Sequence, residues 1–195
     1  MNGLFFINTS LFRTIIIAFI YLLSLWGCSE YSEEVQANLT KLKKTKACSG
    51  CDLTGVELIS FDLKNADLSG ANLTGANLSR VDLTEANLTN ANLTDAILVM
   101  SILTGATLTN TNLSGVKLSY ANLSGVDISD SLLVDASLNS SKILNSKISD
   151  TNMTGANLHS ANLEGTKVSE ENLKDALLCK TIMPSGQQND SGCKR

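Results

Sequence analysis

The chain has 195 residues and a formal net charge of −4, and 43% of its residues are hydrophobic, 5% aromatic and 17% charged. This length suits one domain with a tail, and the scarcity of aromatic rings predicts a core filled by small aliphatic side chains. The mild acidity argues against a surface that binds nucleic acid, because such surfaces are usually basic. We therefore expect no nucleic-acid partner.

The beginning of the chain has the composition of an export signal. Arg13 precedes the 12-residue apolar run TIIIAFIYLLSL, which is shorter than the roughly 20 residues that a membrane-spanning helix needs. The run ends at Leu25, and Leu25-Trp26-Gly27-Cys28 resembles the bacterial lipobox, where a signal peptidase cuts before a cysteine that then receives lipid. We predict a lipoprotein signal peptide over residues 1–27 and lipidation of Cys28.

Lipidation of Cys28 would hold the protein at a membrane of the bacterial cell envelope, on the periplasmic side or at the outer membrane. Two alternatives stay open for the same segment, which are an uncleaved N-terminal anchor and an ordinary secretory signal. In all three cases the body of the protein leaves the cytoplasm.

Residues 28–47 are predicted to form a linker and a short amphipathic helix. Val35, Leu39 and Leu42 fall at positions i, i+4 and i+7, which form one stripe on a helix. Ser32 suits the N-cap, acidic residues follow in the first turn, and lysines lie in the last turn. The apolar stripe needs a surface to cover, and we expect it to cap the open end of the next element.

A five-residue repeat dominates the rest of the chain. From Leu53 to Leu178 every fifth residue is apolar, which gives 26 positions without a break, and 21 of them are Leu. The other five positions hold Ile128, Ile143, Ile148, Met153 and Val168. A period of five would spread these side chains around a helix and onto both faces of a continuous strand. The chain must therefore turn once in each repeat.

Each repeat offers two residues that can point inward. These are the central Leu and the residue two places before it, most often Ala as in Ala66, Ala71 and Ala76, and the polar residues around them suit turns. Four corners close a square, so one coil takes about 20 residues and stacks on the next at about 4.8 Å. We predict a solenoid over residues 48–178, roughly 30 Å long, that is stabilised by contacts between stacked coils.

The tandem repeat A(D/N)Lxx resembles that of the pentapeptide-repeat family, over about 130 of the 195 residues. The resemblance implies an all-β fold, a right-handed quadrilateral β-helix. Some members of that family resemble a DNA duplex in charge and size and inhibit DNA gyrase. Residues 48–178 hold 15 acidic and 7 basic residues, but basic side chains occur on every face. We therefore do not expect duplex mimicry in this chain.

No candidate for catalysis stands out in the repeat. A rod filled by its own leucines offers no dry, concave cavity with converging polar groups. The only histidine, His159, falls at a predicted outer position. We expect a protein that is not an enzyme, with no metal, no cofactor and no small-molecule substrate.

Besides the lipidation candidate, the chain has four cysteines. Cys48 and Cys51 lie at one end of the predicted rod and Cys179 and Cys193 at the other. The two ends are about 30 Å apart, whereas a disulfide needs Cα atoms within about 7 Å. The candidate disulfides are therefore Cys48–Cys51 and Cys179–Cys193, and export to an oxidising compartment favours them. Two reduced thiols in the core remain the alternative for the first pair.

One outer face departs from the polar pattern. Five of its outer positions hold apolar residues, and a sixth apolar residue follows around the corner. One of the five is Ile59, and the candidates for partner contact are its neighbours Ile97, Val99, Met100, Ile102 and Tyr120. Neighbouring exposed apolar side chains are a candidate contact site for an unknown protein partner. The alternative is that they pack under the N-terminal helix or at a corner.

Glu171 is a second departure, because it falls at an inward position. A carboxylate is costly to bury without a partner. We therefore predict that the last coil opens near the segment SEENLKD and that a tail of residues 179–195 then caps the rod.

The sequence thus predicts a rigid structural or protein-interaction module of the bacterial envelope, attached to the membrane through a lipid on Cys28. The alternative is an exported binding protein that contacts a specific partner through its apolar outer face.

Overall fold

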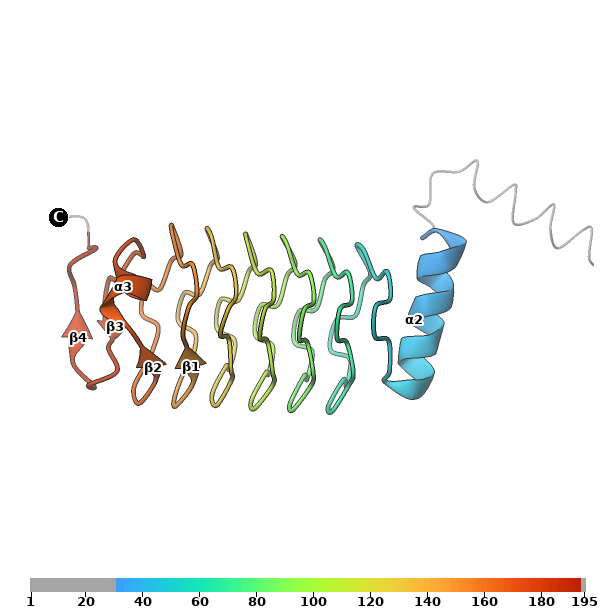
Figure 1. Ribbon diagram of the computed structural model, residues 1–195, viewed down its shortest axis with the longest axis horizontal. Helices are drawn as coiled ribbons and strands as arrows, with labels where there is room; N and C mark the ends of the chain where they lie inside the picture. Colours follow the sequence, from blue (N-terminus) through green and yellow to red (C-terminus); the bar gives the residue numbers. More distant parts are fainter. Residues whose placement is uncertain (1–30, 194–195) are drawn as a thin grey trace, which may run out of the picture. The chain divides into compact units, whose positions relative to one another are not determined.

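The structure is a computed structural model that describes residues 31–193, so Cys28 and the predicted signal peptide lie outside the described residues. The helices and strands of this region all belong to one compact unit, Glu33–Arg195. In Figure 1 this unit is a stack of coils with the helix α2 at one end and the strand β4 at the other.

The helix α2 spans Glu33–Thr45, within the range predicted for an amphipathic helix. Glu33 and Glu34 lie in its first turn and Lys43 and Lys44 in its last, which complements the partial charges of the helix ends. The predicted apolar stripe of Val35, Leu39 and Leu42 is buried.

The helix α2 contacts the first coil through polar groups as well. The side-chain amide of Asn38 donates a hydrogen bond to the carbonyl oxygen of Asp52 at 3.1 Å. The ammonium group of Lys43 lies 5.3 Å from the centre of the Phe61 ring, a distance at which a cation is attracted to the ring face. The buried stripe of α2 therefore has the first coil as its neighbour.

Parallel pairing between residues 20 apart defines the coils. The pairs run from Ala47↔Asp67 to Asn162↔Ile182, and they include Asn72↔Asn92 and Asn92↔Asn112. The backbone N–H of Leu73, for example, donates to the carbonyl oxygen of Asn92 at 2.7 Å. Each side of a coil is too short for an extended strand, so most pairs are single bridges. The exception is the parallel pair of β1 (Lys147–Ile148) and β2 (Lys167–Val168).

A tight turn follows each side of a coil. In one of these corners the N–H of Val56 donates to the carbonyl oxygen of Leu53 at 3.3 Å, and the third residue of the turn, Gly55, has φ +66°. Asn65 occupies the same place in a later turn with φ +57°. Glycine adopts this left-handed region without strain, and Asn tolerates it better than most residues.

The core contains the residues that the repeat places inward. Leu73 and Ala71, a central Leu and the small residue before it, are both fully buried. Where a hydroxyl replaces the small apolar residue it also finds a partner: Thr151 Oγ1 donates to the carbonyl oxygen of Ile128 at 2.9 Å. Other inward hydroxyls donate within their own coil, as Ser101 does to the carbonyl oxygen of Leu98 at 2.7 Å, so an inward hydroxyl is accommodated by a hydrogen bond to a backbone carbonyl group.

The polar outer residues also make repetitive hydrogen bonds. Asn72 Oδ1 accepts hydrogen bonds from the hydroxyl and the backbone N–H of Thr74, at 2.6 and 3.3 Å. In the next coil Asn92 donates from its side-chain amide to the Thr74 hydroxyl at 3.0 Å. An Asn or Asp that precedes the central Leu therefore stabilises its own turn, and Asn72 and Asn92 also link neighbouring coils.

The last coil is interrupted by the short helix α3 (Glu170–Leu173), and a hairpin follows it. The hairpin consists of β3 (Thr181–Ile182) and β4 (Gln188–Asn189), which pair antiparallel. The strand β3 continues the ladder, because Ile182 pairs with Asn162. The tail packs closely on the coil: a Cβ atom added at Gly192 would lie 2.8 Å from the backbone nitrogen of Leu178.

Five aspartates on the outer faces have pKa values below the ordinary value of a carboxyl group, and they are Asp52, Asp62, Asp67, Asp82 and Asp127. The hydroxyl of Thr54 and then its N–H lower the pKa of Asp52. At Asp127 burial is the largest effect and raises the pKa, but hydrogen bonds from Ser129 and Lys147 outweigh it, so the net shift in pKa is downward.

We predict that the stability of the rod is maintained down to about pH 4 and is lost progressively below it. The folded pKa values are depressed, so these aspartates stabilise the folded state above the unfolded pKa of about 4 and stop doing so as the pH falls through the folded values. Thermal unfolding followed by circular dichroism between about pH 7 and pH 2 measures the effect.

The matched control has Asn at the five aspartate positions, since Asn72 shows that Asn makes the same turn. This variant should unfold near the wild-type temperature at neutral pH and lose much less stability in acid. An equally steep acid loss in both proteins would contradict the assignment to these side chains.

Candidate functional site

The apolar patch, Ile97, Val99, Met100, Ile102 and Tyr120, lies on adjacent coils at one corner of the rod. Met100, Ile102 and Tyr120 are 49%, 41% and 62% exposed, whereas Ile97 and Val99 are half-buried. The N–H of Met100 donates to the carbonyl oxygen of Ser119 at 3.0 Å, which places Tyr120 beside Met100 on the next coil. The structure therefore brings the five residues together, with three of them well exposed.

Met100 and Tyr120 belong to a corner column that differs from the other three corners. Its seven members share a positive φ although none of them is Gly, Asn or Asp, and they are Ser60, Arg80, Met100, Tyr120, Ser140, Ser160 and Lys180. The other corner positions between residues 50 and 165 hold Gly, Asn or Asp, with the single exception of Glu85. A left-handed conformation costs about 1–2 kcal/mol for residues with ordinary side chains. Bulky side chains at a corner that other residues would fill more cheaply favour a functional role.

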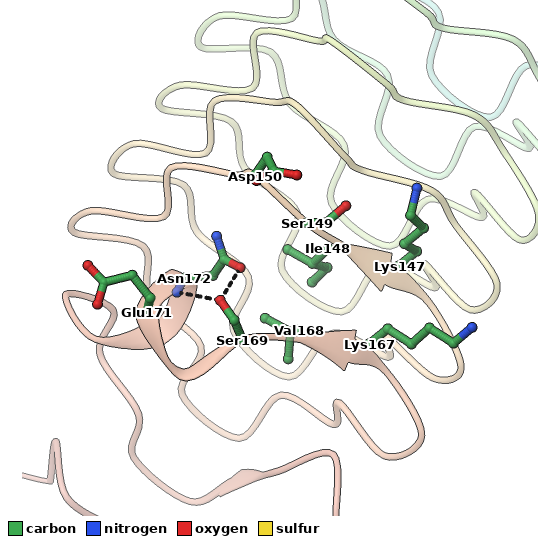
Figure 2. A pocket seen from close by; sticks show the side chains of 9 residues that line it. All are labelled: Lys147, Ile148, Ser149, Asp150, Lys167, Val168, Ser169, Glu171 and Asn172. Atoms are coloured by element: carbon green, nitrogen blue, oxygen red, sulfur yellow. Dashed lines mark hydrogen bonds between the residues drawn. The ribbon is translucent and has the colours of Figure 1, made fainter.

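A second candidate site opens where α3 interrupts the last coil. Figure 2 shows the side chains that line this pocket, with Ile148 and Val168 side by side between the two lysines and Asn172. The volume of the pocket is about 470 Å³, and its lining residues are Lys147, Ile148, Ser149, Asp150, Lys167, Val168, Ser169, Glu171 and Asn172. A smaller hollow of about 240 Å³ adjoins it and shares Glu171 and Asn172.

Glu171 lies at the surface where the coil opens. Its side chain is 78% exposed and its carboxylate lies 2.6 Å from the ammonium group of Lys174. Ser169 caps α3 by accepting a hydrogen bond from the N–H of Asn172 at 3.2 Å. The prediction that the coil opens in the segment SEENLKD is thus confirmed, because the carboxylate remains in water and the chain forms a helical turn instead of a side of the coil.

The interruption leaves part of the ladder unpaired. One coil earlier, the N–H of Asp130 donates to Ser149 at 2.9 Å and that of Leu133 to Asn152 at 2.8 Å. The corresponding N–H groups of Asp150 and Met153 donate to no group among residues 31–193. The carbonyl oxygen of Thr151 accepts a hydrogen bond at 2.8 Å from the side chain of Asn172 in place of a backbone N–H.

The polar groups of the pocket are mostly engaged with each other or with their neighbours. The Ser169 hydroxyl donates to Asn172 Oδ1 at 2.6 Å, and the Ser149 hydroxyl donates to Ser129 Oγ at 2.9 Å. Lys147 is paired with Asp127 at 3.3 Å. Among the described residues, neither hydroxyl is hydrogen-bonded to a base that could activate it.

The four cysteines of the described region are joined as two disulfides. The bond Cys48–Cys51 closes a separation of 3 residues, and Cys179–Cys193 closes one of 14, with Cα atoms 5.3 and 4.7 Å apart. Cys48 is fully buried and Cys51 nearly so, under α2. The ammonium group of Lys41 in α2 lies 3.9 Å from the Cys51 sulfur.

Other residues of functional interest lie apart from these sites. His159 is half-buried on an outer face, where its backbone N–H donates to Asn157 Oδ1 at 3.0 Å. Leu132 and Leu177 are 45% and 41% exposed, and the sequence analysis did not single them out. Within residues 31–193 no helix has the length and apolarity needed to cross a membrane.

Sequence reasoning missed most of the pocket. Its lysines and serines fit the ordinary outer positions of the repeat, and only Glu171 at an inward position indicated that the coil would open. The opening, in turn, leaves Val168 half-buried although the repeat places it inward.

Coils of 20 residues, paired in parallel and filled by the central leucines, define a β-solenoid built from five-residue repeats. The chain belongs to the pentapeptide-repeat family: eight copies of the family model described as pentapeptide repeats match it. The matched segments are 48–84, 62–99, 86–125, 103–135, 117–155 and 131–175. Proteins of this family are generally structural or interaction proteins.

Solved structures of pentapeptide repeat proteins are similar to the chain. Rfr23 from the cyanobacterium Cyanothece 51142 is 30% identical, with 70% of this chain and 96% of that chain covered and a TM-score of 0.48. HetL from Nostoc sp. strain PCC 7120, a protein involved in heterocyst differentiation regulation, is 24% identical, with coverages of 82% and 100% and a TM-score of 0.24. QnrB1, a plasmid-mediated fluoroquinolone resistance protein, is 13% identical, with coverages of 68% and 84% and a TM-score of 0.45. Comparison with curated proteins gave no match.

We predict that Glu171→Thr converts α3 into a regular side of the coil. Thr151 lies at the same inward place one coil earlier and donates to Ile128, so a Thr hydroxyl at position 171 should donate to Ile148. The N–H groups of Asp150 and Met153 would regain backbone acceptors. At about 0.5–1.5 kcal/mol for each hydrogen bond, the free energy of unfolding should rise by roughly 1–3 kcal/mol.

Hydrogen exchange of the Asp150 and Met153 amides measures this conversion directly, and denaturant unfolding gives the stability. Glu170→Thr is the control, because Glu170 is an exposed neighbour in the same helix. Unchanged exchange at both amides in Glu171→Thr would show that something other than the carboxylate opens the coil.

Proposed function

We propose that the protein is a non-enzymatic, rigid structural or protein-interaction module of the bacterial cell envelope, held to a membrane by a lipid on Cys28. The observation that carries the structural part is the ladder of residues 20 apart, from Ala47↔Asp67 to Asn162↔Ile182. Such a ladder fixes the spacing of every outer side chain along the rod. A rigid surface of this kind loses little conformational entropy when it binds a partner.

The handedness of the coils and the role of α2 are part of the same proposal. We infer a right-handed quadrilateral winding, which is the winding that membership of the family implies. We also infer that α2 acts as the N-terminal cap of the rod. Its buried stripe, the hydrogen bond from Asn38 to Asp52 and the position of Lys43 over Phe61 support this role. A cap would protect the first coil from pairing with the edge of another chain.

The proposed place in the envelope rests on the sequence Leu25-Trp26-Gly27-Cys28 and on the apolar run before it. The two disulfides agree with export, since such bonds persist mainly in oxidising compartments.

A second candidate function is that of an exported binding protein with a specific protein partner at the apolar patch. The exposure of Met100 and Tyr120, together with their positive φ, favours a contact at this corner. Duplex mimicry has less support, because three lysines interrupt the outer acidic positions by pairing with aspartates. The pairs are Lys46–Asp62, Lys64–Asp82 and Lys147–Asp127.

We predict that the mature protein begins at Cys28 and carries a diacylglyceryl group on its sulfur. Mass spectrometry of the N-terminal peptide, purified from bacterial membranes, measures both the cleavage site and the added lipid. The Cys28→Ser variant is the matched control and should retain the signal peptide and lack lipid. A mature chain that begins elsewhere without lipid would contradict the anchor, and a chain that begins at Met1 would indicate an uncleaved segment.

A further inference from the structure

The apolar patch projects from a convex part of the rod. Met100 and Tyr120 occupy the third position of their turns, at a corner where neighbouring sides of the coil meet. Ile102 follows just beyond the same corner and pairs with Asp82 and Asn122 on the adjacent coils. The exposed side chains therefore form a short ridge along the rod rather than a groove across it.

Three cationic side chains surround this ridge. The N–H of Arg80 donates to the carbonyl oxygen of Val99 at 2.9 Å, so Arg80 precedes Met100 in the corner column. Lys117 pairs in register with Ile97, and Lys142 pairs with Asn122, which itself pairs with Ile102. All three side chains are exposed.

None of these three cations has an ion-pair partner in the described region of the chain. Other lysines on the outer faces do have one, as in Lys46–Asp62 and Lys64–Asp82 at 3.1 and 3.2 Å. Residues 48–178 are acidic as a whole, with 15 acidic and 7 basic residues. Asp82, the acidic residue in register with Ile102, is paired with Lys64 at 3.2 Å, so the three cations without an ion-pair partner lie next to the patch on a rod that is acidic as a whole.

We propose that the apolar patch and its three cations form a membrane-contact ridge that inserts into the interface of an anionic bilayer. Tyr, Met and Ile side chains suit the boundary between lipid headgroups and acyl chains, and flanking Arg and Lys residues are attracted to anionic lipids. The acidic remainder of the rod would be repelled from the same surface, which would fix the orientation of the protein.

The shape of the patch favours a bilayer over a protein partner. A convex ridge needs a matching apolar groove on a protein, whereas the bilayer interface accommodates an apolar ridge without prior fit. Exposed cations next to an apolar stripe are also the composition of interfacial membrane segments. The proposal rests in part on the proposed lipid anchor, because an anchored chain remains close to the bilayer and makes a weak second contact effective.

The oxidation of Met100 by hydrogen peroxide tests the proposal. The full chain, purified from membranes, is incorporated into vesicles of phosphatidylcholine alone or with about a third of phosphatidylglycerol, and oxidation is followed by mass spectrometry. Met100 should oxidise at least about threefold more slowly on the anionic vesicles, because its side chain would leave water. High salt should reduce this protection, since it screens the attraction.

Two other methionines serve as internal references. Met183 lies in the C-terminal tail and is partly exposed, so its oxidation rate should not depend on the lipid. Met153 is 2% exposed and should stay protected in every sample, as long as the rod remains folded. Equal slowing of Met100 and Met183 would indicate general shielding by the vesicles and would overturn the proposal.

Substitutions test whether the side chains of the ridge cause the protection of Met100 while the fold stays intact. The triple change Arg80→Gln, Lys117→Gln and Lys142→Gln should abolish the dependence of Met100 oxidation on anionic lipid. Tyr120→Asn should weaken the protection without loss of thermal stability, because Asn tolerates the positive φ of this corner. Arg13 and the rest of the N-terminal segment are unchanged in these variants, so the anchor is the same in all of them.

The outcomes distinguish this proposal from the anchor. A lipidated chain that floats with the vesicles but shows no lipid-dependent protection of Met100 contradicts the ridge and leaves the anchor intact. If the unmodified chain purified from membranes carries no lipid on Cys28 and Met100 is still protected, the ridge is supported and the anchor is contradicted. Protection that occurs in native membranes and is absent from both kinds of pure lipid vesicle would assign the patch to a protein partner, and the proposal would then be wrong.

Discussion

The hydrogen bond between coils is the interaction on which the structure depends. In the regular coils the N–H of the central residue donates to the carbonyl group 19 positions later, as from Leu73 to Asn92 and from Leu93 to Asn112, both at 2.7 Å. This bond requires every coil to contain the same number of residues, so each side must turn after five. The inward Leu and Ala side chains then stack on those of the next coil, and burial and hydrogen bonding stabilise the same register. A single coil has neither this burial nor these hydrogen bonds between coils, which explains why the repeat must occur many times.

Departures from the repeat carry most of the functional information, because the regular positions are determined by packing. Glu171 at an inward place opens a coil and creates a pocket beside β1 and β2. Met100 and Tyr120 occupy corner positions where Gly or Asn would fit with less strain, and they present apolar surface to water. The two disulfides lie at opposite ends of the solenoid, under α2 and in the C-terminal tail, where stacking neighbours are missing on one side. The departures therefore lie at the ends of the ladder, at its interruption by α3, or at a corner of the coils.

Much of this architecture follows from the sequence, because a period of five permits few solutions. The inward positions, the coil of 20 residues and the amphipathic helix over Val35, Leu39 and Leu42 all derive from spacing alone. The sequence also identified Met100 and Tyr120 as a departure on one face. It did not reveal that Ile97 and Val99 would be half-buried, since that depends on how the side chains of adjacent coils cover each other. Nor did it reveal the short helix α3, because the register of five is kept through Leu173 and Leu178 even where the backbone leaves the ladder.

The register between coils is the central claim, and NMR tests it most directly through scalar couplings across hydrogen bonds. The amide nitrogen of Leu93 should couple to the carbonyl carbon of Asn112, and that of Leu73 to the carbonyl carbon of Asn92. Couplings with this constant separation along the rod would establish that the coils stack as described. Couplings of these amides to carbonyl groups at other separations, or between antiparallel neighbours, would contradict the account.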